Sequence, residues 1–345
     1  MTAKGATERP PRAPTIRDVA RTAGVSKSLV SLVLRDDPGV SPERRRAVRA
    51  AMRELGYEPN RLARALAGNG TGAIGVLLND LRNPWYVDLL DGLSTALEPA
   101  GIAPLIVDSA TNQRVGRSSI DILVRQRVDG IVVVGTSGEG ARSSPTLRTT
   151  PVVLAGTYDP DDIGADVVVN DDVAGARQAT EHLLALGHRH VSHLRGPQHV
   201  GELRELGYRQ AMDAAGLTAL VHVESAGMTE DSGHTATRRL LARHPRPTGI
   251  VAYNDLVAIG ALSAAYDAGL TAPEDVSVIG YDDTYFSSIR RLSLSSVENG
   301  TFEIGTQAAT FLLDRIAGHV GPSRVHQVPS HVVVRGTSGP APSPH

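Results

Sequence analysis

The sequence predicts an α/β protein in two parts: a small all-helical head and a larger body of two doubly wound parallel sheets. Residues 15–56 break at glycines and prolines into three short helices, and from residue 74 onward short apolar runs alternate with helical segments. Residues 1–70 hold 14 Lys or Arg against 7 Asp or Glu, and because the whole chain sums to −2, residues 71–345 carry −9. A basic head on an acidic body suggests that the head binds a polyanion.

The composition, with 41% hydrophobic and 21% charged residues in a chain of 345, is typical of a globular protein of two or three domains. The chain has no cysteine, which excludes disulfides and thiolate chemistry. Residues 1–14 are polar and lack the apolar segment of a secretory signal, so we expect a flexible tail there. No apolar run approaches the roughly 20 residues needed to span a bilayer. We therefore expect a cytoplasmic, nucleoid-associated protein without a membrane partner.

The three helices of the head have recognisable starts and stops. Thr15 and Asp18 form a capping box for the first helix, which ends at a glycine turn. Ser26 is placed to cap the second helix. Residues 41–43, Ser-Pro-Glu, open the third helix, and Gly56 ends it. Two short helices joined through a glycine turn and followed by a third predict a helix-turn-helix.

In a helix-turn-helix, the second helix usually lies in the major groove with its first residues against base edges. Lys27, Ser28 and Ser31 face outward near the start of that helix, and small polar and cationic side chains suit base contacts. The segments IRDVARTAGVSKSLVSLVL and VSPERRRAVRAAMRELGYEPNRLARALAG resemble the DNA-binding head of the lactose-repressor (LacI) family of bacterial transcription regulators. The resemblance continues from Thr15 to about Gly336.

The resemblance implies contacts with double-stranded operator DNA. The expected DNA-binding residues are Thr15, Lys27, Ser28, Ser31, Leu32, Arg35, Asn60, Arg61, Ala63 and Leu66. Leu32 departs from the family, which commonly has arginine at this position, so a guanine-reading guanidinium is missing there, and an apolar contact to a thymine methyl is a substitute that leucine can offer. The operator sequence should therefore differ from that of better-known relatives.

Residues 59–67, PNRLARALA, have a helical pattern that is only about two turns long, and isolated helices this short are marginal in water. The resemblance implies that two such hinge helices, one from each subunit of a homodimer, enter the minor groove, where Leu66 wedges a base step open. The other interpretation is an ordinary linker helix. The joint extends to residue 71. Residues 70–75 fit G-x-G-x-x-G but follow a helix and precede a strand, so we reject a dinucleotide site and expect no cofactor.

The body, residues 72–336, alternates strands with helices, which predicts parallel sheets with ligands bound beyond the carboxyl ends of the strands. Predicted strands are 74–78, 103–107, 130–134, 152–155, 167–169, 191–194, 249–252 and 276–281. Predicted helices are 85–100, 174–186, 201–215, 232–244 and 256–268. The resemblance implies a two-lobed periplasmic-binding-protein-like body. Lobe one would take about 72–168 and 299–328, and lobe two about 169–298 and 329–336. Residues 337–345, rich in Pro, Gly and Ser, read as a flexible tail.

The resemblance also implies a small-molecule effector between the lobes, most simply a sugar or sugar derivative. Arg offers a fork of donors and Asp a two-oxygen acceptor for hydroxyl groups. The expected effector-binding residues are Asn83, Trp85, Tyr86, Arg204, Asn254, Asp255 and Asp282. Met228, Glu298 and Asn299 replace residues more usual in the family. For Arg204 and Asp282 the alternative is a structural ion pair, and for Trp85 it is packing at the lobe edge.

Other classes of function were weighed against a repressor. His188, His190, His193 and His199 lie close in sequence, but no cysteine or acidic ligand is set among them, so we expect no metal site. No motif supplies a nucleophile with a partnered base, so we expect no catalytic residue and no enzyme. The alternative function is a solute-binding or sugar-processing protein with an incidental basic arm. Architectural DNA binding without an effector would leave the body without a role.

Overall fold

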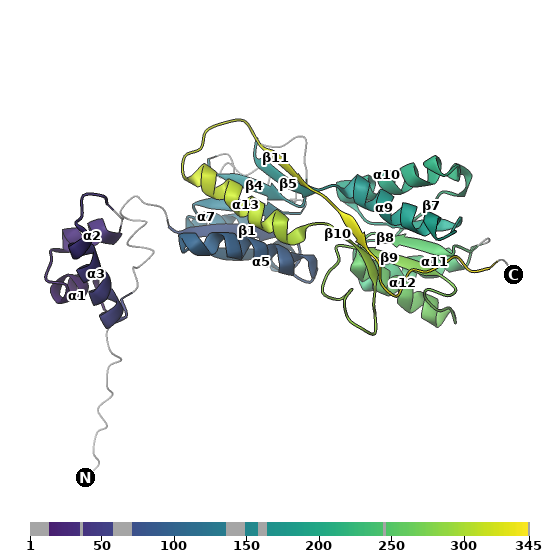
Figure 1. Ribbon diagram of the computed structural model, residues 1–345, viewed down its shortest axis with the longest axis horizontal. Coiled ribbons are helices and arrows are strands. Elements are labelled where there is room, and N and C mark those ends of the chain that lie inside the picture. Colours follow the sequence, from purple (N-terminus) through teal and green to yellow (C-terminus); the bar gives the residue numbers. More distant parts are fainter. Residues whose placement is uncertain are drawn as a thin grey trace, which may run out of the picture. The chain divides into compact units, whose positions relative to one another are not determined.

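The computed structural model describes residues 14–34, 37–57, 71–135, 149–157, 164–243 and 246–343. The chain divides into two compact units, a head (Met1–Thr71) and a body (Gly72–His345), whose elements are labelled in Figure 1. Five predicted DNA contacts lie outside the described residues: Arg35, Asn60, Arg61, Ala63 and Leu66. Among the helices that the structure describes, none combines the length and the apolar character needed to cross a membrane.

The described part of the head contains helices α1 (Ile16–Thr22), α2 (Lys27–Leu34) and α3 (Pro42–Leu55). They meet on a core centred on Val19, Val30 and Val48, each fully buried. Caps set the helix ends as the sequence indicates. Thr15 donates to the Asp18 carboxylate from both its amide and its hydroxyl, and the Ser26 hydroxyl accepts from the Leu29 amide at 3.1 Å. The helix-turn-helix prediction is confirmed.

Lobe one of the body is a six-stranded sheet in the order β11-β5-β4-β3-β1-β2, with all neighbouring strands parallel. Its strands are β1 (Ala73–Leu78), β2 (Ala103–Asp108), β3 (Gly130–Val134), β4 (Val152–Ala155), β5 (Asp166–Asn170) and β11 (Val325–Val328). Its helices are α5 (Trp85–Leu97), α6 (Ser109–Arg114), α7 (Ser119–Gln126) and α13 (Thr301–Ile316), with a 3₁₀ turn η1 (Glu98–Ala100). Helices α5 and α13 cover one face of the sheet and α7 packs on the other, so central strands such as β3 are buried throughout.

Lobe two is a second six-stranded sheet in the order β12-β10-β9-β8-β6-β7, parallel except for the antiparallel pair β10 and β12. Its strands are β6 (Val191–Arg195), β7 (His222–Ser225), β8 (Gly249–Ala252), β9 (Ser277–Tyr281), β10 (Ser295–Glu298) and β12 (His331–Val333). Its helices are α9 (Asp172–Ala185), α10 (Gln198–Ala214), α11 (Glu230–Leu241) and α12 (Asp255–Asp267), with a 3₁₀ turn η3 (Thr218–Leu220). Helices α9 and α10 cover one face, and α11 and α12 cover the other. The prediction of two doubly wound sheets is confirmed.

The chain passes from one sheet to the other three times, between β5 and α9, between β10 and α13, and between β11 and β12 (Figure 1). These passages fall near the expected lobe boundaries. Strand β5 runs to Asn170, slightly beyond residue 168, where lobe one was expected to end. The carboxyl ends of β5, β10 and β11 therefore lead into the connections that join the lobes.

Helices pack in close pairs because glycines face the backbone of the partner helix. A Cβ at Gly260 of α12 would lie 2.0 Å from the Glu230 carbonyl oxygen of α11, and one at Gly233 of α11 would lie 2.4 Å from the Val257 carbonyl oxygen. Gly92 of α5 and Gly305 of α13 approach the partner backbone in the same reciprocal way. These separations leave no room for a methyl group without parting the helices.

Gly260→Ala is expected to lower the free energy of unfolding of the body by about 1–3 kcal/mol, because α11 and α12 must separate. The sign is informative, since alanine in a helix interior otherwise stabilises by about 1 kcal/mol relative to glycine. Urea unfolding followed by circular dichroism would measure the change. Tyr266→Ala, at a position of α12 that is 80% exposed, is the control and should be nearly neutral. A stabilised Gly260→Ala protein would contradict the close packing.

The carboxyl-terminal segment differs from the flexible tail expected at 337–345. The Val278 amide donates to the Thr337 carbonyl oxygen at 2.8 Å, and the Thr337 hydroxyl donates to the Val278 carbonyl oxygen at 2.8 Å. Farther along, the Gly339 carbonyl oxygen lies 3.0 Å from His188 Nε2, and the Ala341 amide donates to the Leu186 carbonyl oxygen. The segment is ordered because lobe two offers it polar partners, which composition does not reveal.

Candidate functional site

The outward face of α2 begins with exposed side chains of Lys27 and Ser28. Both lie in the first turn of the helix, after the Ser26 cap, so backbone amides and a cation point the same way there. This arrangement is suited to phosphate and base-edge contacts. Ser31 and Leu32, one turn farther on, are half-buried, and Leu32 packs partly on the head core. Only part of Leu32 is therefore free for the thymine contact expected of it.

A cavity of about 70 Å³ lies in the body and is lined by residues of both lobes. From lobe one and the end of β5 come Asn79, Asn83, Trp85, Tyr86, Gly135, Gly156 and Asn170, and from lobe two Gln198, Val200, Arg204, Met228, Tyr253, Asn254 and Asp282. Six of the seven expected effector-binding residues line this cavity. The exception is Asp255.

Arg204 of α10 is the only cation on the cavity wall among the described residues. Its Nε donates to Asp172 Oδ1 at 2.7 Å, its Nη1 donates to the Tyr253 carbonyl oxygen, and its Nη2 lies 3.4 Å from Asp282 Oδ1. The guanidinium also lies 3.6 Å from the centre of the Tyr281 ring. Burial alone would lower the pKa of Arg204. The carboxylates of Asp172 and Asp282 outweigh burial and raise the pKa above its ordinary value, so Arg204 stays charged.

Asp282 follows β9 and is 8% exposed. Its Oδ1 accepts from Asn299 Nδ2 at 3.1 Å and faces Arg204 at 3.4 Å. Burial raises the pKa of Asp282 to about 8, while the Arg204 guanidinium opposes the rise. Arg204 lies closer to Asp172, at 2.7 Å, than to Asp282, at 3.4 Å, so one cation is shared by two carboxyl groups. Asp282 therefore retains an unmet demand for hydrogen-bond donors, which ligand hydroxyls could supply.

The lobe-one wall of the cavity is aromatic. The side-chain oxygen of Asn83 accepts from the Trp85 amide at 3.1 Å at the start of α5. Trp85 and Tyr86 pack edge to face, and both are nearly fully buried. The Trp85 indole N–H is buried without a hydrogen-bond partner within the described part of the chain. An unpaired buried donor is a costly feature, and other atoms of Trp85 form part of the cavity wall.

Asp255 does not line the cavity, contrary to the expectation from the sequence. Both of its carboxylate oxygens are occupied, Oδ2 by the Thr284 amide and hydroxyl at 2.7 Å each and Oδ1 by the Ser296 hydroxyl. Its neighbour Asn254 does line the cavity, but its side chain also caps α12 and donates to the Met228 carbonyl oxygen. In this Asn-Asp pair, Asp255 therefore holds the turn that follows β9.

Several cavity residues were missed in the sequence. Asn79, Gly135, Gly156 and Tyr253 each directly follow a parallel strand, and Asn170 ends one. The rule that ligands bind beyond the carboxyl ends of such strands could have identified them. Asp172, which accepts from Arg204 Nε but does not line the cavity, is not marked by a comparable pattern in the sequence. The departure at Asn299 supplies the amide that donates to Asp282.

The four histidines of the sequence cluster have separate roles, and the described residues hold no group of three or more His, Cys, Asp or Glu able to bind a metal. His188 contacts Thr248, Ser277 and Gly339, whereas His199 lies near Glu202. His193 is fully buried, stacked on Tyr208, and its Nδ1 donates to the Val251 carbonyl oxygen at 3.0 Å. Its Nε2 has no partner within the residues described.

His193 makes the body sensitive to acid. Burial lowers the pKa of His193 to about 4, below the ordinary value of 6.5, so the unfolded chain binds a proton between these values and the folded chain does not. Stability from this residue is complete above pH 6.5 and is lost as pH falls, by about 2 kcal/mol between pH 7 and 5. His193→Gln should lose less stability over that interval, as measured by urea unfolding at both pH values. Equal losses in the two proteins would refute this role.

The fold and the two sites define a class: DNA-binding regulatory proteins with a helix-turn-helix head and a periplasmic-binding-protein-like domain. Comparison with known proteins agrees. The model of the bacterial regulatory proteins, lacI family, matches residues 15–60, and that of the periplasmic binding protein-like domain matches residues 180–338. The ribose operon repressor of Escherichia coli (strain K12) is 34% identical over 310 residues, which cover 88% of this chain and 93% of that repressor. The chain belongs to the lacI family.

Other relatives are similar over almost their whole length. The transcriptional regulator CelR of Thermobifida fusca is 33% identical over 344 residues, which cover 94% of this chain and 98% of CelR. A solved CelR–cellobiose complex is 31% identical with a TM-score of 0.67, covering 94% of this chain and 99% of that one. A solved lac repressor dimer bound to operator and the anti-inducer ONPF is 27% identical with a TM-score of 0.79, covering 95% and 100%.

Proposed function

We propose that this protein is a transcriptional repressor that binds a near-palindromic operator as a homodimer and responds to a neutral sugar or sugar derivative in the cleft between its lobes. The observation that carries the proposal is the cavity wall, where Arg204 and Asp282 lie opposite an aromatic lobe-one wall. Such a set of polar groups and aromatic surface is typical of sites for polyhydroxylated ligands. The relatives named for ribose and cellobiose support the same class of effector.

The charge of the site favours an uncharged effector. Arg204 already has two carboxylate partners, Asp172 and Asp282, and no second cation lines the described cavity wall. A phosphorylated or carboxylated ligand would bring a further charge into a desolvated site whose one described cation is already paired, which is unfavourable. Hydroxyl groups can donate to Asp282 and pack on the aromatic wall without adding charge. We therefore expect sugars rather than sugar phosphates to bind.

The cavity of about 70 Å³ has room for only a few water molecules. The roughly ten non-hydrogen atoms of a monosaccharide need a larger volume. We infer that the lobes part to admit the effector, bending at the three connections between the sheets. In a dimer, such a movement would change the spacing of the two hinge segments and thereby the stability of the protein–DNA complex. Effector and operator would each favour one arrangement of the same dimer.

The test of the effector class is a thermal-shift screen with neutral sugars, sugar phosphates and nucleosides. A ligand at a hundred times its dissociation constant stabilises the folded state by about 2.7 kcal/mol. We expect stabilisation by one or more neutral sugars, and loss of that stabilisation in Asp282→Asn. Stabilisation by sugar phosphates alone would contradict the charge argument. A sugar effect that persists unchanged in Asp282→Asn would show that the sugar binds elsewhere.

Leu66→Ala is expected to leave the body folded and to weaken operator binding, because the wedge in the minor groove is lost. A gel-shift titration against a near-palindromic operator would measure the affinity, and circular dichroism would verify the fold. Unchanged affinity would favour an ordinary linker helix at 59–67.

The salt dependence of DNA binding distinguishes the repressor from the alternative, a solute-binding or sugar-processing protein with an incidental basic arm. A head that contacts phosphates loses affinity for DNA steeply as salt rises, and specific binding adds discrimination among sequences. Failure to bind any double-stranded DNA at low salt would favour the alternative.

A further inference from the structure

The turn that follows β9 has an unusual backbone. Asp282 and Asp283 have φ values of 97° and 45°, in the left-handed region that residues other than glycine rarely adopt. Two successive residues of this kind cost free energy, so contacts with the surrounding structure must hold them there. The contacts determine which way the Asp282 carboxylate points.

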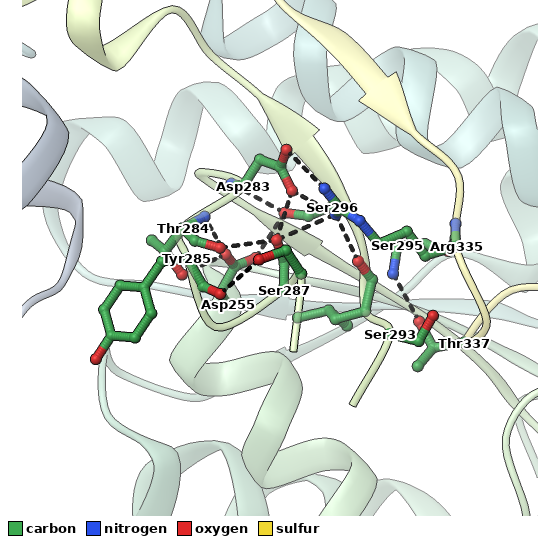
Figure 2. Close-up of polar contacts among 12 residues, drawn as sticks. Asp255, Asp283, Thr284, Tyr285, Ser287, Ser293, Ser295, Ser296, Arg335 and Thr337 are labelled. Atoms are coloured by element: carbon green, nitrogen blue, oxygen red, sulfur yellow. Dashed lines mark hydrogen bonds and ion pairs between the residues drawn. The ribbon is translucent and has the colours of Figure 1, made fainter. Parts of the chain in front are cut away.

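Arg335 holds one side of this turn, as Figure 2 shows. Its Nη1 and Nη2 bind the two carboxylate oxygens of Asp283, and Nη1 also donates to the Leu294 carbonyl oxygen at 2.8 Å. The Ser287 hydroxyl donates to Asp283 Oδ1 at 2.6 Å. A bidentate guanidinium–carboxylate pair fixes both distance and direction, which a single hydrogen bond does not. The Asp283 and Arg335 side chains are only 13% and 21% exposed.

Asp255 holds the other side, through Thr284 and Ser296 (Figure 2). By contrast, the partners of the Asp282 carboxylate within the described ranges are Arg204, at 3.4 Å, and Asn299, which donates at 3.1 Å. These are longer contacts than those that hold its neighbours. The orientation of Asp282 therefore depends on the turn, and Asp255 and Arg335 come from segments far from it in sequence.

We propose that Arg335 is a positioning residue for effector binding: through Asp283 it keeps the Asp282 carboxylate directed into the cleft. This inference rests on the proposed function, since it assigns to Arg335 a share of the affinity of that site. Arg335 does not line the cavity. The neighbouring carboxyl-terminal segment has its own bonds at Thr337 and Gly339, so loss of the Arg335 side chain leaves that segment attached.

The experiment measures affinity for D-ribose and for cellobiose by titration calorimetry in the full-length protein and in Arg335→Gln, Arg335→Lys, Asp283→Asn and the double variant Arg335→Gln/Asp283→Asn. Arg335→Gln should weaken binding by about tenfold to a hundredfold, because a charged hydrogen-bonded contact is lost. Arg335→Lys, which keeps the charge without the bidentate geometry, should fall between. The double variant should bind as Arg335→Gln does, since both changes break one interaction.

Arg315→Gln is the matched control, because Arg315 likewise binds a buried carboxylate, that of Asp166 in lobe one, away from the cleft. Its sugar affinity should stay within about twofold of the unchanged protein, while its stability falls as that of Arg335→Gln does. The proposal is overturned if Arg335→Gln keeps its affinity, or if Arg315→Gln loses as much. In either case Arg335 has a structural role only.

A measurement without any sugar separates failure of this proposal from failure of the proposed function. The amides of Asp282, Asp283 and Thr284 donate to Val297, Ser296 and Asp255, so they should exchange slowly with deuterium in the unchanged protein. If neither sugar binds, the effector is neither D-ribose nor cellobiose, and exchange decides the positioning role. Faster exchange across 282–284 in Arg335→Gln, but not in Arg315→Gln, supports it, and unchanged exchange overturns it.

Discussion

Replacing Arg204 by alanine is expected to lower the free energy of unfolding of the body by about 3–5 kcal/mol, because Asp172 and Asp282 are left buried without their shared cation. The same change should abolish stabilisation by any sugar that binds the cleft. Arg204→Lys should recover little, since an ammonium group lacks the planar fork that reaches Asp172, Tyr253 and Asp282 together and the stacking on Tyr281. Urea unfolding and thermal shift with the sugar would measure both effects.

A control variant and a double variant test the interpretation of Arg204→Ala. Arg177→Ala removes a half-exposed partner of Glu181 on α9 and should cost less than about 1 kcal/mol. Arg204→Ala/Asp282→Asn should be less destabilised than the sum of the single changes, because the second removes one of the carboxylates that the first leaves unpaired. Strict additivity would show that Asp282 is not coupled to Arg204.

Asp166→Asn should lower the free energy of unfolding by about 3 kcal/mol, with lobe one as the region affected. The Asp166 side chain is fully buried and accepts five hydrogen bonds from Arg315 and Arg324, which join the start of β5 to α13 and β11. Asparagine preserves the shape but leaves Arg315 without the carboxylate that it binds and Arg324 with Asp314 as its remaining carboxylate partner. Urea unfolding at pH 7 would measure the loss, and hydrogen exchange would locate it.

The pH dependence gives a second check on Asp166. Burial works against ionisation of this carboxyl, but the bonds from Arg315 and Arg324 outweigh it and hold the pKa well below its usual range. A depressed folded-state pKa means that the stabilisation is complete above about pH 4 and declines as pH falls, because the unfolded chain takes up a proton first. The difference in the free energy of unfolding between Asp166→Asn and the unchanged protein should therefore become smaller below pH 4. A gap independent of pH would assign the loss to packing alone.

The three helices in the described part of the head could be predicted from sequence because their ends are set locally. Thr15, Ser26 and Ser41 cap the three helices, and Gly56 ends the third in the left-handed conformation at φ 58°. Each cap satisfies amides within a few residues, so the relevant interactions are visible in the sequence. The central strands of the body were equally clear, since β3, buried on both faces, is a continuous apolar run.

Four strands at or next to the sheet edges were missed for the opposite reason. The strands β7, β10, β11 and β12 are short and carry polar residues, as in Ser-Ser-Val-Glu of β10, so neither apolar runs nor alternation marks them. Strand β11 pairs with β5, which lies more than a hundred residues earlier in the chain. Such pairings exist only because the folded lobe offers an unpaired edge.

The sequence by itself determined the helix-turn-helix and the two parallel sheets, because caps and apolar runs are local signals, and the family resemblance supplied six of the residues that line the cleft. Only the tertiary structure decided which carboxylate serves which purpose. Asp282 faces the cleft, Asp255 holds the adjoining turn, Asp172 pairs with the buried Arg204, and Asp166 pairs with Arg315 and Arg324. It also attached residues 337–341 to lobe two. The role of a charged side chain depends on burial and on partners from distant segments, and neither is written in its immediate neighbours.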